Sequence, residues 1–250
     1  MPSTALRPRT GPEIIDAAAH LLRSHYAQFV TVSAVIFLPI VASRLFLPEP
    51  YLALGDVLKL GLWPLAQGAG VLATSEVYLG REVHPTSCVL RALSRIGSLM
   101  GVLFVQGFLI AGGFILLIVP GFLAIASTFA MPMVVVLEER GVLDALGRSR
   151  DLAQGSRSRI LGVQALSALI VFAAQLVMTW PLMLLVGRDS ARTAAIITDA
   201  VLILLFPLPY IVATLLYYDL RIRREGFDLE VMAAELDRPK PAGPSASAVG

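Results

Sequence analysis

The longest uncharged stretch of the chain is residues 96–137, which read IGSLMGVLFVQGFLIAGGFILLIVPGFLAIASTFAMPMVVVL. It contains 42 residues, whereas a helix needs about 20 apolar residues to cross the hydrocarbon core of a bilayer. The stretch is therefore too long for one membrane span and long enough for two. Pro120 and Gly121 predict the break between the two spans, because proline ends a helix and glycine allows a turn. We expect a transmembrane hairpin here.

The composition of the whole chain fits a protein made largely of such stretches. Of its 250 residues, 56% are hydrophobic and 15% are charged, whereas soluble domains average about 45–50% and about 25%. Too few charges remain to cover a soluble surface, which excludes an ordinary soluble enzyme, a disordered chain and a collagen-like fibre. The basic residues lie beside apolar segments, so we expect no nucleic-acid partner. The single cysteine, Cys88, predicts neither a disulfide nor a metal site.

Apolar segments of spanning length occur six times, which predicts an all-α polytopic membrane protein with six transmembrane helices in three hairpins. They cover residues 27–47, 60–79, 96–119, 121–137, 160–186 and 194–218. With their connectors they form a single membrane domain, residues 11–236. We expect residues 1–10 to be a flexible N-terminus and residues 237–250 a disordered tail. A short apolar run with a cleavage site is absent near the N-terminus, so no cleaved signal peptide is expected.

Basic residues are distributed very unevenly between the connectors. Sixteen of the 20 Lys and Arg residues fall in the two terminal segments or in the loops after the second and fourth spans. Only Arg44, Lys59, Arg188 and Arg192 fall on the opposite side. Because cytoplasmic segments of membrane proteins are enriched in Lys and Arg, this bias predicts a multi-pass protein of the cell membrane with both termini in the cytoplasm.

A short amphipathic segment on the basic side precedes each predicted hairpin, at residues 10–23, 85–95 and 142–153. In the first segment, Thr10 and Glu13 form a capping-box pattern ahead of an apolar face. We expect three interfacial helices here and a fourth at residues 226–236. Their recurrence indicates three similar units. Alternatively, basic amphipathic connectors are general to six-helix membrane proteins.

Two segments carry a resemblance to a known family. They read PMVVVLEERGVLDALGRSRDLAQG at residues 132–155 and YYDLRIRREGFDL at residues 217–229. They resemble the membrane domain associated with some bacterial glycerophosphoryl diester phosphodiesterases, and related uncharacterised integral membrane proteins of actinobacterial type. The resemblance covers residues 11–236 and implies a six-span membrane domain of largely unknown role, which in some relatives precedes a soluble phosphodiesterase domain. We expect no such soluble domain and no catalytic residue here, because no soluble stretch is long enough for a barrel.

The sequence contains no recognisable catalytic or cofactor-binding motif. P-loop, GxGxxG and HExxH patterns are absent. His20 and His25 are five residues apart, so on one helix they point to different faces and chelate a metal poorly. We therefore expect no enzyme activity, no cofactor and no metal, and solvated or structural roles for these histidines and for His84.

Two acidic residues fall inside predicted spans, where charges are costly and often functional. Glu76 lies near the basic end of the second span, and Asp199 lies several residues into the sixth. In a structural interpretation, Glu76 pairs with Arg81, and Asp199 is satisfied by Arg192 or by the outer interface. A proton or ion site is the alternative for both residues.

Arginines beside an apolar helix face lie at headgroup depth and attract anionic lipid by about 1 kcal/mol each. The candidate contacts to lipid headgroups or a partner are Arg23, Arg91, Arg95, Arg148, Arg150, Arg157 and Arg159. Positive charge that only sets the topology is the alternative.

These features favour a non-enzymatic scaffold or accessory protein that engages anionic lipid or a membrane-protein partner at the cytoplasmic face. A second copy of the chain is a further candidate partner. One alternative function is a small transporter or channel for a lipid-like or amphipathic solute, and another is a membrane component of glycerophospholipid metabolism.

Overall fold

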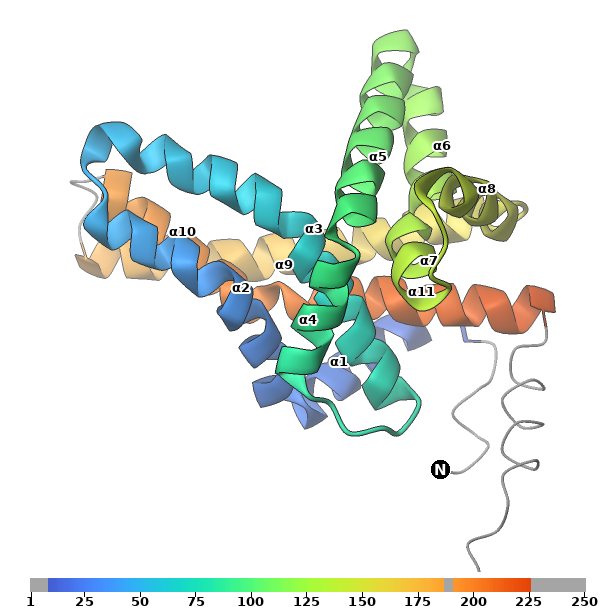
Figure 1. Cartoon of the computed structure of the whole chain (residues 1–250), viewed down its shortest axis with the longest axis horizontal. Coiled ribbons are helices and arrows are strands. Elements are labelled where there is room, and N and C mark those ends of the chain that lie inside the picture. Colours follow the sequence, from blue (N-terminus) through green and yellow to red (C-terminus); the bar gives the residue numbers. More distant parts are fainter. Residues whose placement is uncertain (1–8, 187–190, 226–250) are drawn as a thin grey trace, which may run out of the picture.

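The computed structural model describes residues 9–186 and 191–225, which form helices without any β-strand (Figure 1). In chain order the elements are α1 (Gly11–Ser24), α2 (Tyr26–Phe46), the 3-10 turn η2 (Glu49–Tyr51), α3 (Leu52–Tyr78), α4 (Pro85–Ser94), α5 (Ile96–Leu116), α6 (Ile118–Thr128), α7 (Met131–Leu137), α8 (Val142–Ala153), α9 (Arg157–Val186), α10 (Ala191–Leu205) and α11 (Pro207–Glu225). The tail predicted at 237–250, the helix predicted at 226–236 and most of the N-terminus predicted to be flexible lie outside the described residues.

Five helical stretches of the described chain are long and apolar enough to cross a membrane. They are Tyr26–Phe46, Ile96–Leu116, Ile118–Leu137, Arg157–Leu185 and Ala191–Glu225. The remaining predicted span, residues 60–79, lies in α3, which is helical over 27 residues. This helix carries Asp56 and Lys59 near its start and Glu76 near its end, and it is not among the five stretches. The fold class predicted from the sequence is thus confirmed as all-helical with several apolar helices of spanning length.

The break in the uncharged stretch 96–137 is not where the sequence analysis placed it. α5 ends at Leu116 and α6 begins at Ile118, so the turn is made by the extended residue Leu117, with φ −168° and ψ 159°. Pro120 falls in the first turn of α6, where a missing N–H costs little because that donor has no partner within the helix. Gly113 and Gly121 let the hairpin close, because a Cβ on Gly113 would lie 2.8 Å from the Cα of Gly121, and a Cβ on Gly121 would lie 2.5 Å from the ring of Phe114.

Prolines also divide two of the predicted spans into two helices each. α7 begins at Met131 with Pro132 in its first turn, and α11 begins directly at Pro207. Proline is favoured in the first turn of a helix and disrupts a helix interior. The fourth and sixth spans are therefore bent segments, made of α6 with α7 and of α10 with α11.

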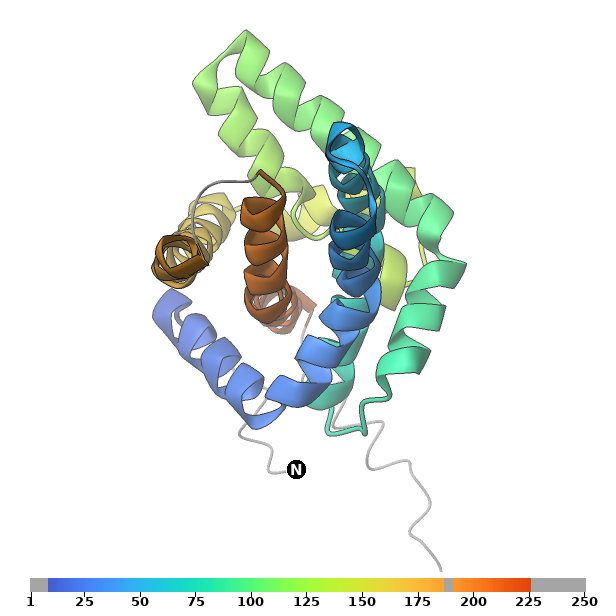
Figure 2. The same ribbon diagram turned by 90° about the vertical axis from the view of Figure 1, so that its left-hand side faces the viewer.

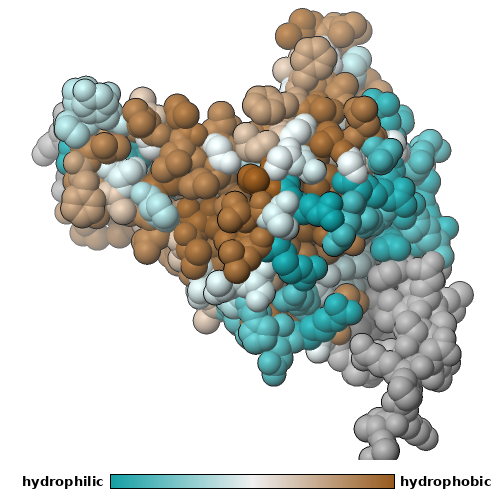
Figure 3. All heavy atoms as spheres, viewed as in Figure 1, coloured by the Kyte–Doolittle hydropathy of each residue, from teal (hydrophilic) through white to brown (hydrophobic). Residues whose placement is uncertain are grey.

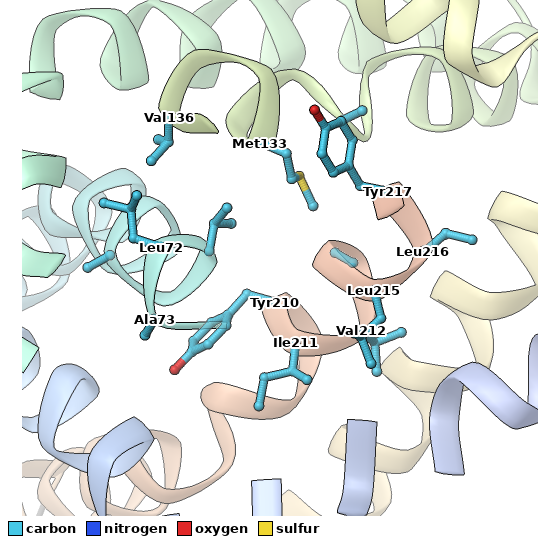
Figure 4. Packing of buried hydrophobic residues seen from close by; sticks show 14 of the residues in the cluster. Leu72, Ala73, Met133, Val136, Tyr210, Ile211, Val212, Leu215, Leu216 and Tyr217 are labelled. Atoms are coloured by element: carbon cyan, nitrogen blue, oxygen red, sulfur yellow. The ribbon is translucent and has the colours of Figure 1, made fainter. Parts of the chain in front are cut away.

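The core lies where α3, α7 and α11 meet. Leu72, Met133 and Tyr217 are fully buried there, and Figure 4 shows side chains of these three helices converging. Each of the three helices belongs to the second half of a predicted hairpin. α1, α4 and α8 pack around them, with contacts from α1 to α11, from α4 to α3 and from α8 to α7.

Three helix pairs extend from this core as arms, namely α2 with α3, α5 with α6 and α9 with α10 (Figures 1 and 2). Phe46, Phe108, Ile115 and Leu185 on these arms are 80–85% exposed. Figure 3 shows hydrophobic surface over the arms and hydrophilic surface along the lower and right-hand edges of the molecule. Burying one such side chain is worth about 1.5–3 kcal/mol, so arms with this surface require an apolar environment.

Helices occupy the three segments predicted to be amphipathic, namely α1, α4 and α8. The capping box of the first is confirmed, because the Thr10 N–H donates to Glu13 Oε2 at 2.6 Å. α4 buries Cys88 and Ala92, whereas Leu90 and Leu93 are 59% and 48% exposed. These two leucines therefore point away from the core.

Candidate functional sites

The basic face is the surface formed by α1, α4, α8 and the C-terminal end of α11. Glu138, which follows α7, is its central acceptor: Arg148 Nε donates to it at 3.1 Å, Arg140 Nε lies 2.9 Å away, and the Tyr217 hydroxyl donates at 2.7 Å. Arg148 Nη2 also donates to Glu225 at 2.8 Å, and this hydrogen bond raises the pKa of the Arg148 guanidinium. Arg148 thus joins α8 to α7 and α11 as a permanent cation.

A second carboxylate, Asp219 of α11, is 3% exposed and binds three donors. Arg159 Nη2 lies 2.8 Å away, Arg223 Nε donates at 2.9 Å, and the backbone N–H of Arg9 donates at 2.6 Å. This group therefore ties α11 to the start of α9 and to the chain just before α1.

Glu76 of α3 accepts from Arg91 of α4 at 3.1 Å, and the Cys88 thiol lies 3.4 Å from its other oxygen. Arg81, the partner named from the sequence, forms no ion pair within the described chain. Burial, reinforced by the neighbouring carboxylate, raises the pKa of Cys88 to about 12. Cys88 is therefore a buried, protonated thiol on the side of α4 that faces the core.

The three acids share one pattern. Glu76 near the end of α3 binds α4, and Glu138 after α7 binds α8. Asp219 of α11 binds the residue that leads into α1, so the third contact returns to the first unit. Glu76 and Glu138 thus each link the second half of one predicted hairpin to the amphipathic helix that follows it, and Asp219 links α11 to the residue just before α1.

The seven arginines predicted to reach lipid headgroups fall into two groups, those that bind a carboxylate of the chain and those that do not. Arg91, Arg95, Arg148 and Arg159 each bind a carboxylate of the chain itself, Arg95 through Glu139 at 2.7 Å. Arg23, Arg150 and Arg157 are exposed and have no hydrogen-bond or ion-pair partner among the described residues. Only the latter three present an uncompensated charge to the surroundings.

A buried ion cluster lies in the arm formed by α2 and α3, away from the basic face. Arg44 of α2 and Asp199 of α10 are both 3% exposed, and Arg44 Nε donates to Asp199 at 3.2 Å. Lys59 of α3 also binds Asp199, and Arg44 Nη2 donates to Asp56 at 2.5 Å. Arg192, expected to pair with Asp199, instead donates to the backbone carbonyl of Leu47 at 2.8 Å. Asp199 is therefore a structural acceptor that holds α2, α3 and α10 together.

The space beside Asp199 is too small to hold a water molecule. A larger cavity of about 560 Å³ lies nearby between α9, α10 and α11 and is lined mostly by apolar groups. Ser167, which is 1% exposed, lines this cavity, and its hydroxyl has no hydrogen-bond partner. Gln175 in the same wall donates to Thr179 at 3.0 Å. This cavity suits an apolar guest with one polar group.

A second cavity, of about 330 Å³, lies at the basic face and contains His25 and His84. These two histidines are 59 positions apart and neither belongs to a motif, so the sequence alone predicts no contact between them. The one signal available was that each directly precedes a helix. His20 does not line this cavity.

Within the described residues, no three His, Cys, Asp or Glu side chains are grouped as metal ligands. Comparison of the chain with protein-family models, with curated proteins and with solved structures gives no match. The resemblance to the phosphodiesterase-associated membrane domain stays a prediction.

Proposed function

We propose that the chain crosses the membrane six times, with α3 as the remaining span, and acts as a non-enzymatic scaffold whose basic face, in the cytoplasm, binds anionic lipid. A helix of 27 residues is about 40 Å long, which exceeds the roughly 30 Å of a hydrocarbon core. The charged residues of α3 lie toward its two ends, and residues 60–75 carry none. This distribution supports a crossing by α3.

One observation carries the lipid-binding proposal. Exposed arginines without partners and exposed leucines lie on α1, α4 and α8 of the basic face and at the adjoining start of α9; they are Arg23, Arg150, Arg157, Leu90, Leu93 and Leu143. Cations beside apolar side chains match the boundary between lipid headgroups and acyl chains. At about 1 kcal/mol for each arginine, the three supply about 3 kcal/mol, or about 100-fold in affinity for an anionic surface.

The lipid proposal is tested by exchanging all three arginines for glutamine. Wild type and the triple variant R23Q/R150Q/R157Q are placed in nanodiscs of phosphatidylcholine with one-fifth phosphatidylglycerol, and retained phosphatidylglycerol is measured by native mass spectrometry. We expect enrichment by the wild type and loss of that enrichment in the glutamine variant, whereas the triple lysine variant, which keeps the charge, retains it. Equal enrichment in all three proteins would show that these arginines do not bind lipid.

The topology is tested in a Cys88→Ser background with one new cysteine at Ser158 or at Pro50. Both positions are exposed, and they lie on opposite sides in the proposed arrangement. A membrane-impermeant maleimide added to intact cells should label the cysteine at position 50 and leave that at position 158 unlabelled. Labelling at both positions would contradict the arrangement.

The cavity between α9, α10 and α11 favours a second candidate function, the passage of a lipid-like solute. The unpartnered Ser167 hydroxyl could accept or donate a hydrogen bond to a polar group carried into the membrane. The assay is the flipping of a fluorescent phospholipid in proteoliposomes. If the cavity forms the route, Ala168→Trp, which fills it, slows flipping strongly, whereas Leu169→Trp on the exposed side of α9 does not. Flipping at the rate of protein-free liposomes would rule this function out.

A further inference from the structure

The cavity of about 330 Å³ at the basic face brings together two parts of the chain. Its walls include His25 and Gln28 from the junction of α1 and α2, and Gly80, Arg81, Glu82 and His84 from the loop between α3 and α4. Figures 1 and 2 both place this junction and this loop together at the lower end of the molecule. The volume is at the lower end of the range for small-molecule sites, about 300–1,000 Å³.

We propose that this cavity binds a phosphate monoester group, carried by a lipid headgroup or by a free phosphate. Three side chains in its walls can carry positive charge, His25, Arg81 and His84, against one carboxylate, Glu82. Glu82 is 92% exposed and is 4.0 Å from His84, so it neutralises the cavity only weakly. Arg81 is exposed and forms no ion pair among the residues that the structure describes. A guanidinium with two imidazoles is a strong set of donors for phosphate oxygens.

The N-termini of two helices, α2 and α4, lie at the cavity walls. His25 directly precedes α2 and His84 directly precedes α4, and neither side chain bonds to the first N–H groups of its helix. The C-terminal ends of α1 and α3 lie at the same walls, since His25 also caps α1 and Gly80 follows the cap of α3, so the helix dipoles offset one another there. What α2 and α4 contribute is their first N–H groups, which bind phosphate at helix N-termini.

The loop that carries Arg81 has a defined conformation. Gly80 has φ +71°, and its N–H donates to Val77 O at 3.0 Å, while the Arg81 N–H donates to Glu76 O at 2.8 Å. This is the left-handed glycine ending typical of helices, and it directs the chain from α3 back along the cavity. Arg81 is thus presented from an ordered turn.

The charge of the walls indicates which form of phosphate is bound. A phosphate monoester has a second pKa of about 6, so it is mostly doubly charged at neutral pH, whereas a phosphodiester carries a single charge. Arg81, His25 and His84 therefore favour a monoester over a diester. Gln28, whose side-chain oxygen has no hydrogen-bond partner, lies in the same wall.

The source of the phosphate depends on where the cavity lies. It adjoins the first residue of α2, at which a candidate span begins, so under the proposed function it is at headgroup depth and the guest is a phosphatidic acid. Binding of free phosphate does not depend on that placement. This inference therefore rests on the proposed function only for the lipid source.

The experiment compares wild type with Arg81→Gln and His84→Gln, both at exposed positions, and with His20→Gln as the matched control outside the cavity. In one arm, nanodiscs containing equal small amounts of phosphatidic acid and phosphatidylglycerol are analysed by native mass spectrometry. In the other, inorganic phosphate is titrated onto the protein in pure phosphatidylcholine nanodiscs by calorimetry. Thermal unfolding of each variant shows that it is folded.

We expect wild type and His20→Gln to select phosphatidic acid over phosphatidylglycerol, and each cavity variant to lose at least tenfold in that selectivity. Selective phosphatidic acid binding without phosphate binding identifies the lipid as the guest, and phosphate binding that depends on Arg81 without lipid selectivity identifies free phosphate. The proposal is overturned if neither guest binds, or if folded cavity variants bind as well as wild type. The variant R23Q/R150Q/R157Q tests the proposed scaffold function separately, through its retention of phosphatidylglycerol. Its three substitutions leave this cavity intact.

Discussion

Replacing Asp199 with asparagine removes the carboxylate that accepts from both Arg44 and Lys59. Arg44 is 3% exposed, so in the variant its charge stays buried and keeps only Asp56, which is 65% exposed, and the backbone carbonyl of Leu52. Breaking a buried pair by removing one partner costs about 3–5 kcal/mol, mostly because the other charge is left without compensation. We expect Asp199→Asn to destabilise the protein by that amount.

The assay is thermal unfolding in a mild detergent. Since 1 kcal/mol shifts the midpoint of a protein of 150–250 residues by about 2–4 °C, the expected decrease is about 6–20 °C. Asp56→Asn is the matched control: it removes a carboxylate from the same cluster, but one that is mostly exposed, and should cost at most about 1 kcal/mol.

A double-mutant cycle with Arg44→Gln makes the test specific. If the pair is structural, the double variant is less destabilised than the sum of the single variants, with a coupling energy of about 0.5–3 kcal/mol. An unfolding midpoint unchanged in Asp199→Asn, or full additivity in the cycle, would refute the assignment of Asp199 as a structural acceptor and return it to the class of proton or ion sites.

Three further outcomes are predicted, two for substitutions and one for the reactivity of Cys88 in the unchanged protein. Gly55→Ala should lower the unfolding midpoint by the equivalent of about 1–3 kcal/mol, because its Cβ would lie 2.9 Å from Arg44 Cζ, whereas Gly61→Ala, with open space around it, should be neutral or stabilising. Cys88 should react slowly with maleimide in the folded protein at pH 8 and faster as the pH approaches its pKa of about 12, since the thiolate is the nucleophile; fast labelling at pH 8 without unfolding would contradict its burial. Arg148→Gln should destabilise by about 1–3 kcal/mol, because Glu138 and Glu225 lose a shared donor, while Arg150→Gln on the exposed side of α8 stays within about 0.5 kcal/mol; both are read by thermal unfolding.

Hydropathy and local pattern were sufficient to place the helices. The uncharged stretch 96–137 does fold as a helical hairpin, with α5 packed against α6 and α7 continuing the second half, and α1 begins at the capping box formed by Thr10 and Glu13. The turn at Leu117 was missed because proline is tolerated in the first turn of a helix as well as beyond its end. The same sequence is compatible with a break before or after Pro120, and helix packing at Gly113 and Gly121 decides between them.

The partners of charged groups were much harder to predict, because spacing along the chain relates only residues that are close in sequence. Arg81 is five positions from Glu76, but the actual donor is Arg91, fifteen positions away on another helix. Asp199 and Arg44 are 155 positions apart. Such pairs are set by how the hairpins pack against one another, and one sequence read through local spacing contains no signal for that packing.

Positive charge on the basic face has two separate consequences, and the ion pairs affect only one of them. Topology depends on the number of Lys and Arg residues near the spans, and acidic residues contribute little to it, so pairing Arg91 with Glu76 or Arg148 with Glu138 leaves the predicted orientation as it was. Attraction of anionic lipid depends instead on net charge in the folded state. Of the seven arginines predicted to reach lipid headgroups, neutralisation by the chain's own carboxylates therefore leaves Arg23, Arg150 and Arg157 as the ones on which the proposed lipid binding depends.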